Sequence, residues 1–244
     1  TMKGAPKRDL SPQALNCPRN RGNSRIVAYL KLNQREENQA EQIEKLRDGP
    51  TIDECDALII SMPSTTFMQR RNRAIVVLFA MTAMRATVAV GLQLRHIDLD
   101  RRLVTQDGRE VKTKFGKRFV SMLIPFRSHW PDLLREYVAE LVSMGFCAKD
   151  PLFPKMGPAS GKGAAFNTDE VTREFCSDAQ ALRIILDESI AQSGLKRFTL
   201  HQLRHMHGAI LVDPLCDPGI EKALSLNLGH ARVEVTRESY ANMP

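Results

Sequence analysis

The feature that most limits how this chain folds is one strongly apolar run, residues 74–84. It is shorter than the ~18 to 20 apolar residues of a membrane-spanning helix, and arginines flank it on both sides. Arg70, Arg71 and Arg73 precede it and Arg85 follows it. A chain of 244 residues is long enough to bury a sizeable core around such a run. We therefore predict a buried helix over residues 69–84 inside one large domain, and no membrane partner.

Further helices are predicted from apolar side chains at helical spacing and from residues that begin or end helices. Thr51 is a suitable N-cap for the first of them, and Ile52, Cys55 and Leu58 belong to its apolar face. The other predicted helical segments are residues 86–94, 130–144, 168–193, 200–212, 218–228 and 233–240.

The middle of the chain differs from these helical segments. Residues 102–125 contain short runs of strand-forming residues, separated by the turn sequences Asp107-Gly108 and Phe115-Gly116. This pattern predicts a small antiparallel sheet. Residues 148–166 carry several prolines and glycines and are predicted to form a loop. The predicted fold class is α+β, a mostly helical domain with one small antiparallel β-sheet.

The N-terminal part is polar and charged. Residues 1–25 are basic and rich in turn formers, and residues 24–48 show a charged helical pattern that ends before Gly49-Pro50. We place the boundary there. Residues 1–48 are predicted to be an arm and linker, and residues 49–244 the main domain.

Charge and cysteine usage narrow the functional class. The chain has 35 Lys and Arg against 28 Asp and Glu, a net charge of +7. Such a balance is typical of proteins that bind polyanions, because each neutralised phosphate releases counterions, although a merely basic protein fits equally well. The 5 cysteines form no Cys-x-x-Cys pair, which excludes the usual zinc-ribbon spacing and favours reduced thiols in the cytosol.

The candidate functional residues are weak evidence one at a time. His201 and Arg204 stand three positions apart and share a helix face, but a surface pair has the same spacing. Leu228-Gly229-His230 also fits a helix end with a glycine cap. Equally ordinary explanations exist for the remaining candidates, which are Arg85, Lys114 and Tyr240.

Taken together, in order and local context, these segments resemble the tyrosine recombinases, also called phage-type integrases. The resemblance covers roughly residues 51–240. Its strongest motifs are His-x-x-Arg, and Leu-Gly-His followed ten residues later by Tyr. The matching segments are residues 82–85, 92–100, 113–117, 201–205, 228–230 and 236–240.

The resemblance implies a site-specific DNA recombinase or integrase that cleaves and rejoins strands through a 3′-phosphotyrosyl intermediate on Tyr240. It implies no metal, ATP or other cofactor, double-stranded DNA as partner, self-association on DNA as a tetramer, and action at the nucleoid in the cytoplasm. The implied catalytic residues are Arg85, Lys114, His201, Arg204, His230 and Tyr240.

The chemistry of these residues suits that role. A phosphodiester under attack by an oxygen gains negative charge, and a guanidinium can donate two parallel hydrogen bonds to its non-bridging oxygens. Arg85 and Arg204 would form such a clamp, with His230 as a further donor. A phenol has a pKa near ~10, so Tyr240 needs a proton acceptor, for which His201 is suited.

Lys114 would protonate the departing 5′ oxygen, with Lys112 and Lys117 as competing candidates. Val88 stands where many family members have a Glu that supports the first Arg. Only four residues follow Tyr240, which leaves little of the usual C-terminal tail. The usual N-terminal DNA-clamping domain is missing or reduced to residues 1–48, so the chain is expected to be a fragment of a longer protein.

Three alternatives stay open. A type IB topoisomerase or a telomere-resolving enzyme would use similar residues, although the His-x-x-Arg form favours recombinases. A DNA-binding regulator that has kept the fold without the catalysis is the second. The third is a metal site on His201 and His205, one helical turn apart, for which the motif offers no acidic third ligand.

Overall fold

The computed structural model describes residues 49–113, 116, 118–157, 170–213, 215–230, 232–235 and 237. The chain divides into two units, residues 1–45 and 46–244, and every described residue belongs to the second. The arm and linker predicted over residues 1–48 therefore lie outside the described residues. So do two of the predicted catalytic residues, Lys114 and Tyr240.

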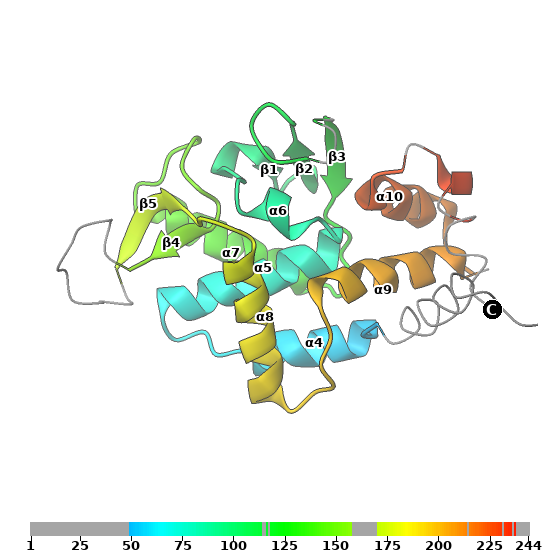
Figure 1. Cartoon of the computed structure of the whole chain (residues 1–244), viewed down its shortest axis with the longest axis horizontal. Coiled ribbons are helices and arrows are strands. Elements are labelled where there is room, and N and C mark those ends of the chain that lie inside the picture. The colour runs from blue at the N-terminus through cyan, green and yellow to red at the C-terminus, as the bar shows by residue number, and fades with distance from the viewer. Residues whose placement is uncertain are drawn as a thin grey trace, which may run out of the picture. The chain divides into compact units, whose positions relative to one another are not determined.

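The predicted buried helix is confirmed as α5 (Phe67–Thr82), which lies in the middle of the described domain (Figure 1). Thr66 begins it in a capping box with Gln69. Every residue from 74 to 82 is buried. Since α5 contacts α4, α7, α8, α9 and β3, it is the element around which the others pack.

Two helices cover α5 along its length. The first is α4 (Ile52–Ser61), where Thr51 and Glu54 form the predicted N-terminal cap as a capping box. The second is α7 (Trp130–Ser143), and the indole of Trp130 donates to Asp56 of α4 at 2.8 Å. The predictions for both helices are confirmed.

The predicted antiparallel sheet is also confirmed. It has three strands in the order β1 (Ile97–Asp98), β2 (Leu103–Gln106) and β3 (Phe119–Met122), with Val104 opposite Ser121. Between β2 and β3 the chain turns at Gly108, where an added Cβ would lie 2.2 Å from the carbonyl oxygen of Gly116. Only glycine allows the two turns of this segment to approach so closely.

The structure corrects the prediction for residues 148–193. In place of a loop followed by a long helix, β4 (Pro154–Met156) and β5 (Val171–Phe175) form a second antiparallel pair, and α8 (Gln180–Ser193) begins later than predicted. Both strands are short, and their pairing joins residues far apart in the sequence. A local apolar pattern does not reveal such a pair.

The predicted helical run over residues 86–94 is only partly right. A single turn, α6 (Ala86–Ala89), is followed by Gln93, which forms an isolated bridge with Pro151, and then by the 3-10 helix η1 (Leu94–His96). Leu94 and Arg95 donate backbone hydrogen bonds to the carbonyls of Asp150 and Ala148. These long-range bonds replace the bonds of a continuous helix.

The two predicted C-terminal helices are confirmed as α9 (Leu200–Val212) and α10 (Pro218–Leu228). A Thr199–Gln202 capping box begins α9. Asp217 caps α10, and Gly229 ends it in the left-handed region with φ 84°. Residues 233–235 and 237 of the helix predicted at residues 233–240 are helical, and the other half of it lies outside the described residues. Within the described part, no helix is long and apolar enough to cross a bilayer.

Candidate active site

Arg85 stands directly after the end of the central helix. Ala83 ends α5 in the left-handed region with φ 49°, an unusual conformation for a residue with a side chain. The Thr82 hydroxyl donates to the Leu78 carbonyl at 2.7 Å and accepts from the Met84 amide at 3.3 Å. This turn sends the chain from α5 to α6, and Arg85 is the residue at that corner.

Arg204 ties this corner to the two C-terminal helices. Its side chain is buried, with 9% of its surface exposed. Nη1 donates to the carbonyl of Ala83, and Nη2 donates to the carbonyl of Leu228 at 2.9 Å. Both carbonyls lie at helix C-termini, which carry partial negative charge and attract a cation. Arg204 therefore joins the ends of α5 and α10 to α9.

The C-terminal end of α10 determines the position of His230. Its amide donates to the Ser225 carbonyl at 3.1 Å, and the left-handed Gly229 precedes it. Buried Asn227 fixes this end of α10 against β3, because its side chain accepts from the Met122 amide at 2.7 Å and donates to the Met122 carbonyl at 2.9 Å. A Cβ built on Gly229 would lie 3.9 Å from Nη1 of Arg85. The segment before His230 therefore lies against Arg85.

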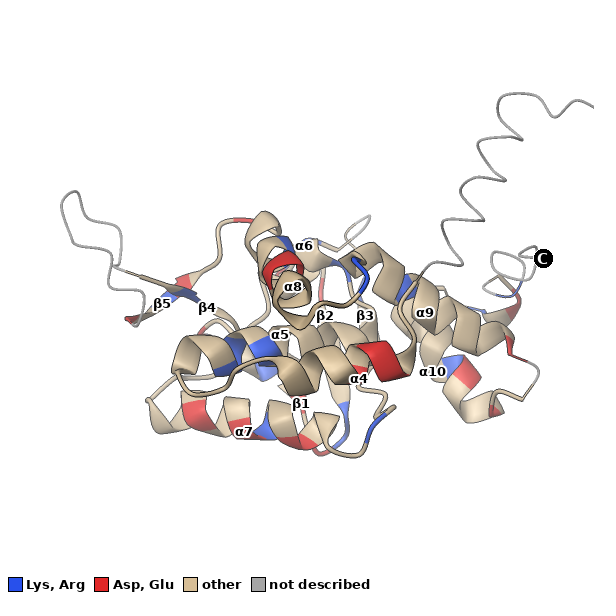
Figure 2. Ribbon diagram, turned by 90° about the horizontal axis from the view of Figure 1, so that it is seen from below, with Lys and Arg blue, Asp and Glu red and all other residues tan. Residues whose placement is uncertain are grey.

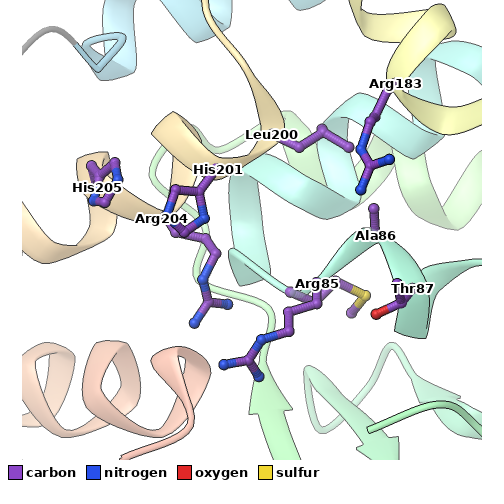
Figure 3. A pocket seen from close by; sticks show the side chains of 9 residues that line it. Arg85, Ala86, Thr87, Arg183, Leu200, His201, Arg204 and His205 are labelled. Carbon is purple, nitrogen blue, oxygen red and sulfur yellow. The ribbon is translucent and has the colours of Figure 1, made fainter. Parts of the chain in front are cut away.

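A pocket of about 370 Å³ lies at the junction of α6, α8 and α9. In Figure 3 the guanidiniums of Arg85 and Arg204 point toward the same region, and His201 stands beside Arg204 at the start of α9. The lining residues are Met84, Arg85, Ala86, Thr87, Arg183, Leu200, His201, Arg204 and His205. The structure thus brings Arg85, His201 and Arg204 together, from segments more than a hundred residues apart in the sequence.

Electrostatics link His230 to the same cluster. Burial lowers the pKa of His201 and of His230, and in both cases the charges of Arg204 and Arg85 lower it further. Both shifts favour the neutral imidazole, which has one nitrogen that accepts a proton or hydrogen bond and one that donates. Four of the six predicted residues form one cationic cluster with two neutral imidazoles, which is suited to an anionic group.

For a metal at His201 and His205, the described residues offer no complete set of ligands. The rings of His201 and His205 lie 4.6 Å apart, edge to face, and burial together with His201 and Arg204 lowers the pKa of His205 to about 4. Among the described residues, no group of three or more His, Cys, Asp or Glu side chains is placed to hold a metal ion.

The sequence missed three features of this site. Arg183 of α8 lines the pocket, and no motif marks it. The anchoring role of Asn227 and the contact between Arg204 and the Ala83 carbonyl were also not predicted. These depend on contacts between residues distant in the sequence, so no local signal could have found them. Figure 2 shows basic residues in the segment between α8 and α9, which contains Lys196 and Arg197.

Comparison with known proteins agrees with this architecture. The model of the phage integrase family matches residues 51–243, and the chain belongs to that family. A curated relative is the tyrosine recombinase XerC of Xylella fastidiosa (strain 9a5c), 27% identical over 198 residues. The match covers 79% of this chain and 56% of the relative, so the chain spans about half the length of the curated relatives it matches.

Solved structures show the same fold. The XerA recombinase superposes with a TM-score of 0.51 at 18% identity, covering 79% of this chain and 59% of that one. The XerH site-specific recombinase bound to its difH substrate gives a TM-score of 0.50 at 23% identity, covering 78% of this chain and 49% of that one.

Proposed function

We propose that this chain is the catalytic part of a site-specific DNA recombinase that cuts and rejoins strands through a 3′-phosphotyrosyl intermediate on Tyr240. The observation that carries the proposal is the convergence of Arg85, His201 and Arg204 on one pocket, with His230 directly after Gly229, which lies against Arg85. Two guanidiniums and two neutral imidazoles are the groups needed to hold and activate a phosphodiester.

In the proposed reaction, the phenolic oxygen of Tyr240 attacks the phosphorus and forms the new P–O bond while the bond to the 5′ oxygen breaks. His201 takes the phenolic proton, for which its neutral ring is suited. Lys114 supplies a proton to the departing 5′ oxygen. The extra negative charge on the non-bridging oxygens is stabilised by Arg85, Arg204 and a hydrogen bond from His230.

The products are a 3′-phosphotyrosyl protein and a free 5′ hydroxyl. One phosphoester bond replaces another, so attack by a 5′ hydroxyl of a second strand runs the same steps in reverse. The reaction therefore needs no ATP, and the proposed steps use no metal. A chelator should leave it unchanged.

The proposed partner is double-stranded DNA. The XerH structures hold that protein on difH DNA before and after cleavage, and the family likeness favours DNA for this chain as well. The net charge of +7 supports the same partner. We further propose assembly into a tetramer on DNA, and action at the nucleoid in the cytoplasm.

The decisive experiment incubates the chain with a pool of nicked duplexes of randomised sequence and separates the products by denaturing electrophoresis. A covalent protein–DNA band is expected from the wild type and not from Tyr240→Phe. Tyr29→Phe is the matched control, and it should keep the band. Absence of the band from the wild type, or its persistence in Tyr240→Phe, would overturn the proposal.

The same protein preparation distinguishes the recombinase from the two alternative functions. Relaxation of supercoiled plasmid without sequence preference would identify a type IB topoisomerase. Tight, sequence-specific binding with no covalent product would identify a regulator.

A further inference from the structure

The pocket lined by Arg85, His201 and Arg204 continues into a second one of about 430 Å³ between α8 and the start of α9. The two pockets share Arg183, Leu200 and His201. The second is also lined by Arg197 and Thr199. A single groove thus runs from Arg85 past Arg183 toward Arg197.

Arg183 is held over this groove by the packing of its helix. Leu182, Ile185 and Ile190 of α8 are buried in the core, so Arg183 lies on the exposed side. Figure 3 shows its guanidinium directed toward Ala86, into the pocket that Arg85 and Arg204 also enter. The packing of α8 therefore places Arg183 beside the pocket.

Within the described part of the chain, Arg183 has no carboxylate partner, although the neighbouring cation Arg197 has one. Asp187, one turn along α8, is an ordinary partner for Arg183 by its i, i+4 spacing. Its carboxylate instead accepts from Arg197, at 3.3 and 3.4 Å. Among the described residues, the side chain of Arg183 has one long contact, 3.4 Å to the amide oxygen of Gln180, and no ion pair.

Arg183 lies beside the pocket that is suited to an anion at Arg85 and Arg204. It is therefore suited to bind a second anion next to that one. A nucleic acid strand carries phosphates in regular succession, so a ligand with one phosphate at Arg85 and Arg204 brings the next ones along the groove. Contacts of this kind fix the register of the backbone without selecting bases.

We propose that Arg183 binds a DNA backbone phosphate next to the one that is cleaved, and so positions the strand along the α8–α9 groove. This inference rests on the proposed function, because it takes the cleaved phosphate to lie in the first pocket. Arg183 is then a positioning residue. Its contact is the same before and during the reaction, so it strengthens binding without accelerating the chemical step.

The experiment measures binding of a short duplex of arbitrary sequence to the full chain over a series of salt concentrations. We expect Arg183→Ala to weaken binding about tenfold and to reduce the slope of log K against log[salt] by about 0.9. Arg183→Lys should keep the slope, since it keeps the charge. Arg135→Ala is the matched control. It removes the same charge from a side chain on α7 that lines neither pocket and pairs with Asp100.

A second measurement tests the positioning role. At saturating nicked DNA, the rate of covalent-complex formation by Arg183→Ala should stay within about threefold of the wild-type rate. An unchanged salt slope, or a slope change equal to that of Arg135→Ala, would overturn the assignment. A rate at saturation that falls while binding is unchanged would also overturn it.

The two proposals fail in different ways. If the wild type forms no covalent complex, the recombinase proposal fails whatever Arg183 does. If the wild type forms the complex and Arg183→Ala binds duplex as the wild type does, only the role of Arg183 fails.

Discussion

The central helix α5 is held in two different ways along its length. From residue 74 to the end of the helix it is buried among apolar side chains of the surrounding helices. At its C-terminal end, polar side chains from α9 and α10 reach its carbonyls. His207 contacts the carbonyl of Ala80 at 2.7 Å, Asn227 that of Met81 at 3.4 Å, and Arg204 that of Ala83.

This difference shows how the fold positions a reactive group. Apolar burial is non-directional and holds α5 in the core, but it does not set the direction in which the chain leaves the helix. The last carbonyls of a helix have no partner within the helix and need donors from elsewhere. Here α9 and α10 supply side-chain donors to these carbonyls. The chain segment that leads to Arg85 is therefore fixed by α9, which carries Arg204, and by α10, which ends just before His230.

The largest expected effect comes from removing Arg204. Arg204→Ala should lower the rate of covalent-complex formation by roughly 10³-fold, because a donor to the developing charge is lost. It should also lower the free energy of unfolding by about 2 to 4 kcal/mol, since the carbonyls of Ala83 and Leu228 lose a charged donor. Single-turnover cleavage and urea unfolding measure the two effects.

Arg85→Ala is the control for that prediction. Arg85 is half-buried, and its side chain makes no hydrogen bond or ion pair with another described residue, so its loss should reduce cleavage strongly and leave the free energy of unfolding nearly unchanged. Equal destabilisation by both substitutions would show that the carbonyl contacts of Arg204 contribute little.

A substitution in the apolar part of α5 should have the opposite effect to Arg85→Ala, because it should lower stability and leave cleavage nearly unchanged. Phe79→Ala removes a ring that is almost completely buried, and it should lower the free energy of unfolding by about 3 to 5 kcal/mol. The cleavage rate of the protein that remains folded should change little, because Phe79 does not line the pocket. Cleavage measured well below the unfolding midpoint checks this. A large loss under those conditions would mean that packing also sets the site.

The burial of His207 should make stability depend on pH. Burial lowers the pKa of His207 from its ordinary 6.5 to about 4, so the unfolded chain binds more protons than the folded one between these values. Stability therefore rises with pH in this window, and is lost as pH falls from about 6.5 toward 4. From about pH 7 to about pH 5 the loss is of the order of 2 kcal/mol.

The test compares urea unfolding of the wild type and His207→Phe at both pH values. The variant should lose less stability than the wild type on acidification, because the other histidines titrate in both proteins. The same pH dependence in the two proteins would contradict the prediction.

The smallest effect is expected at the end of α10. Asn227→Ala removes the side-chain bonds to Met122 and Met81 and should lower the free energy of unfolding by about 1 to 2 kcal/mol. Because His230 follows three residues later, the cleavage rate should fall by more than the loss of folded protein explains. Urea unfolding and single-turnover cleavage of the same preparation measure both quantities.

Ile220→Ala is the control for Asn227→Ala. Ile220 lies on the same helix with 42% of its surface exposed, so its truncation should change neither the free energy of unfolding nor the cleavage rate appreciably. If cleavage by Asn227→Ala fell only in proportion to the loss of folded protein, Asn227 would stabilise α10 without positioning His230.

Much of the fold followed from local patterns. The central helix, α7, α9 and α10 were predicted because apolar spacing and end signals such as Thr199 and Gly229 act within a few residues. The β4–β5 pair and the early end of the helix predicted over residues 86–94 were missed because the hydrogen bonds of these segments join distant residues. For the site, the motifs pointed to Arg85, His201, Arg204 and His230, and the places of Lys114 and Tyr240 stay predictions.

By itself the sequence determined which chemical groups are available and in what order, since each motif is a short run whose residue types can be seen directly. Only the tertiary structure decided how those groups are used. Arg204 is buried and bound to the carbonyls of Ala83 and Leu228, while Arg183 enters the pocket without a carboxylate partner among the described residues. Pairing of charges and capping of helix ends depend on distances across the folded domain, and these exist only once α8, α9 and α10 have packed against α5.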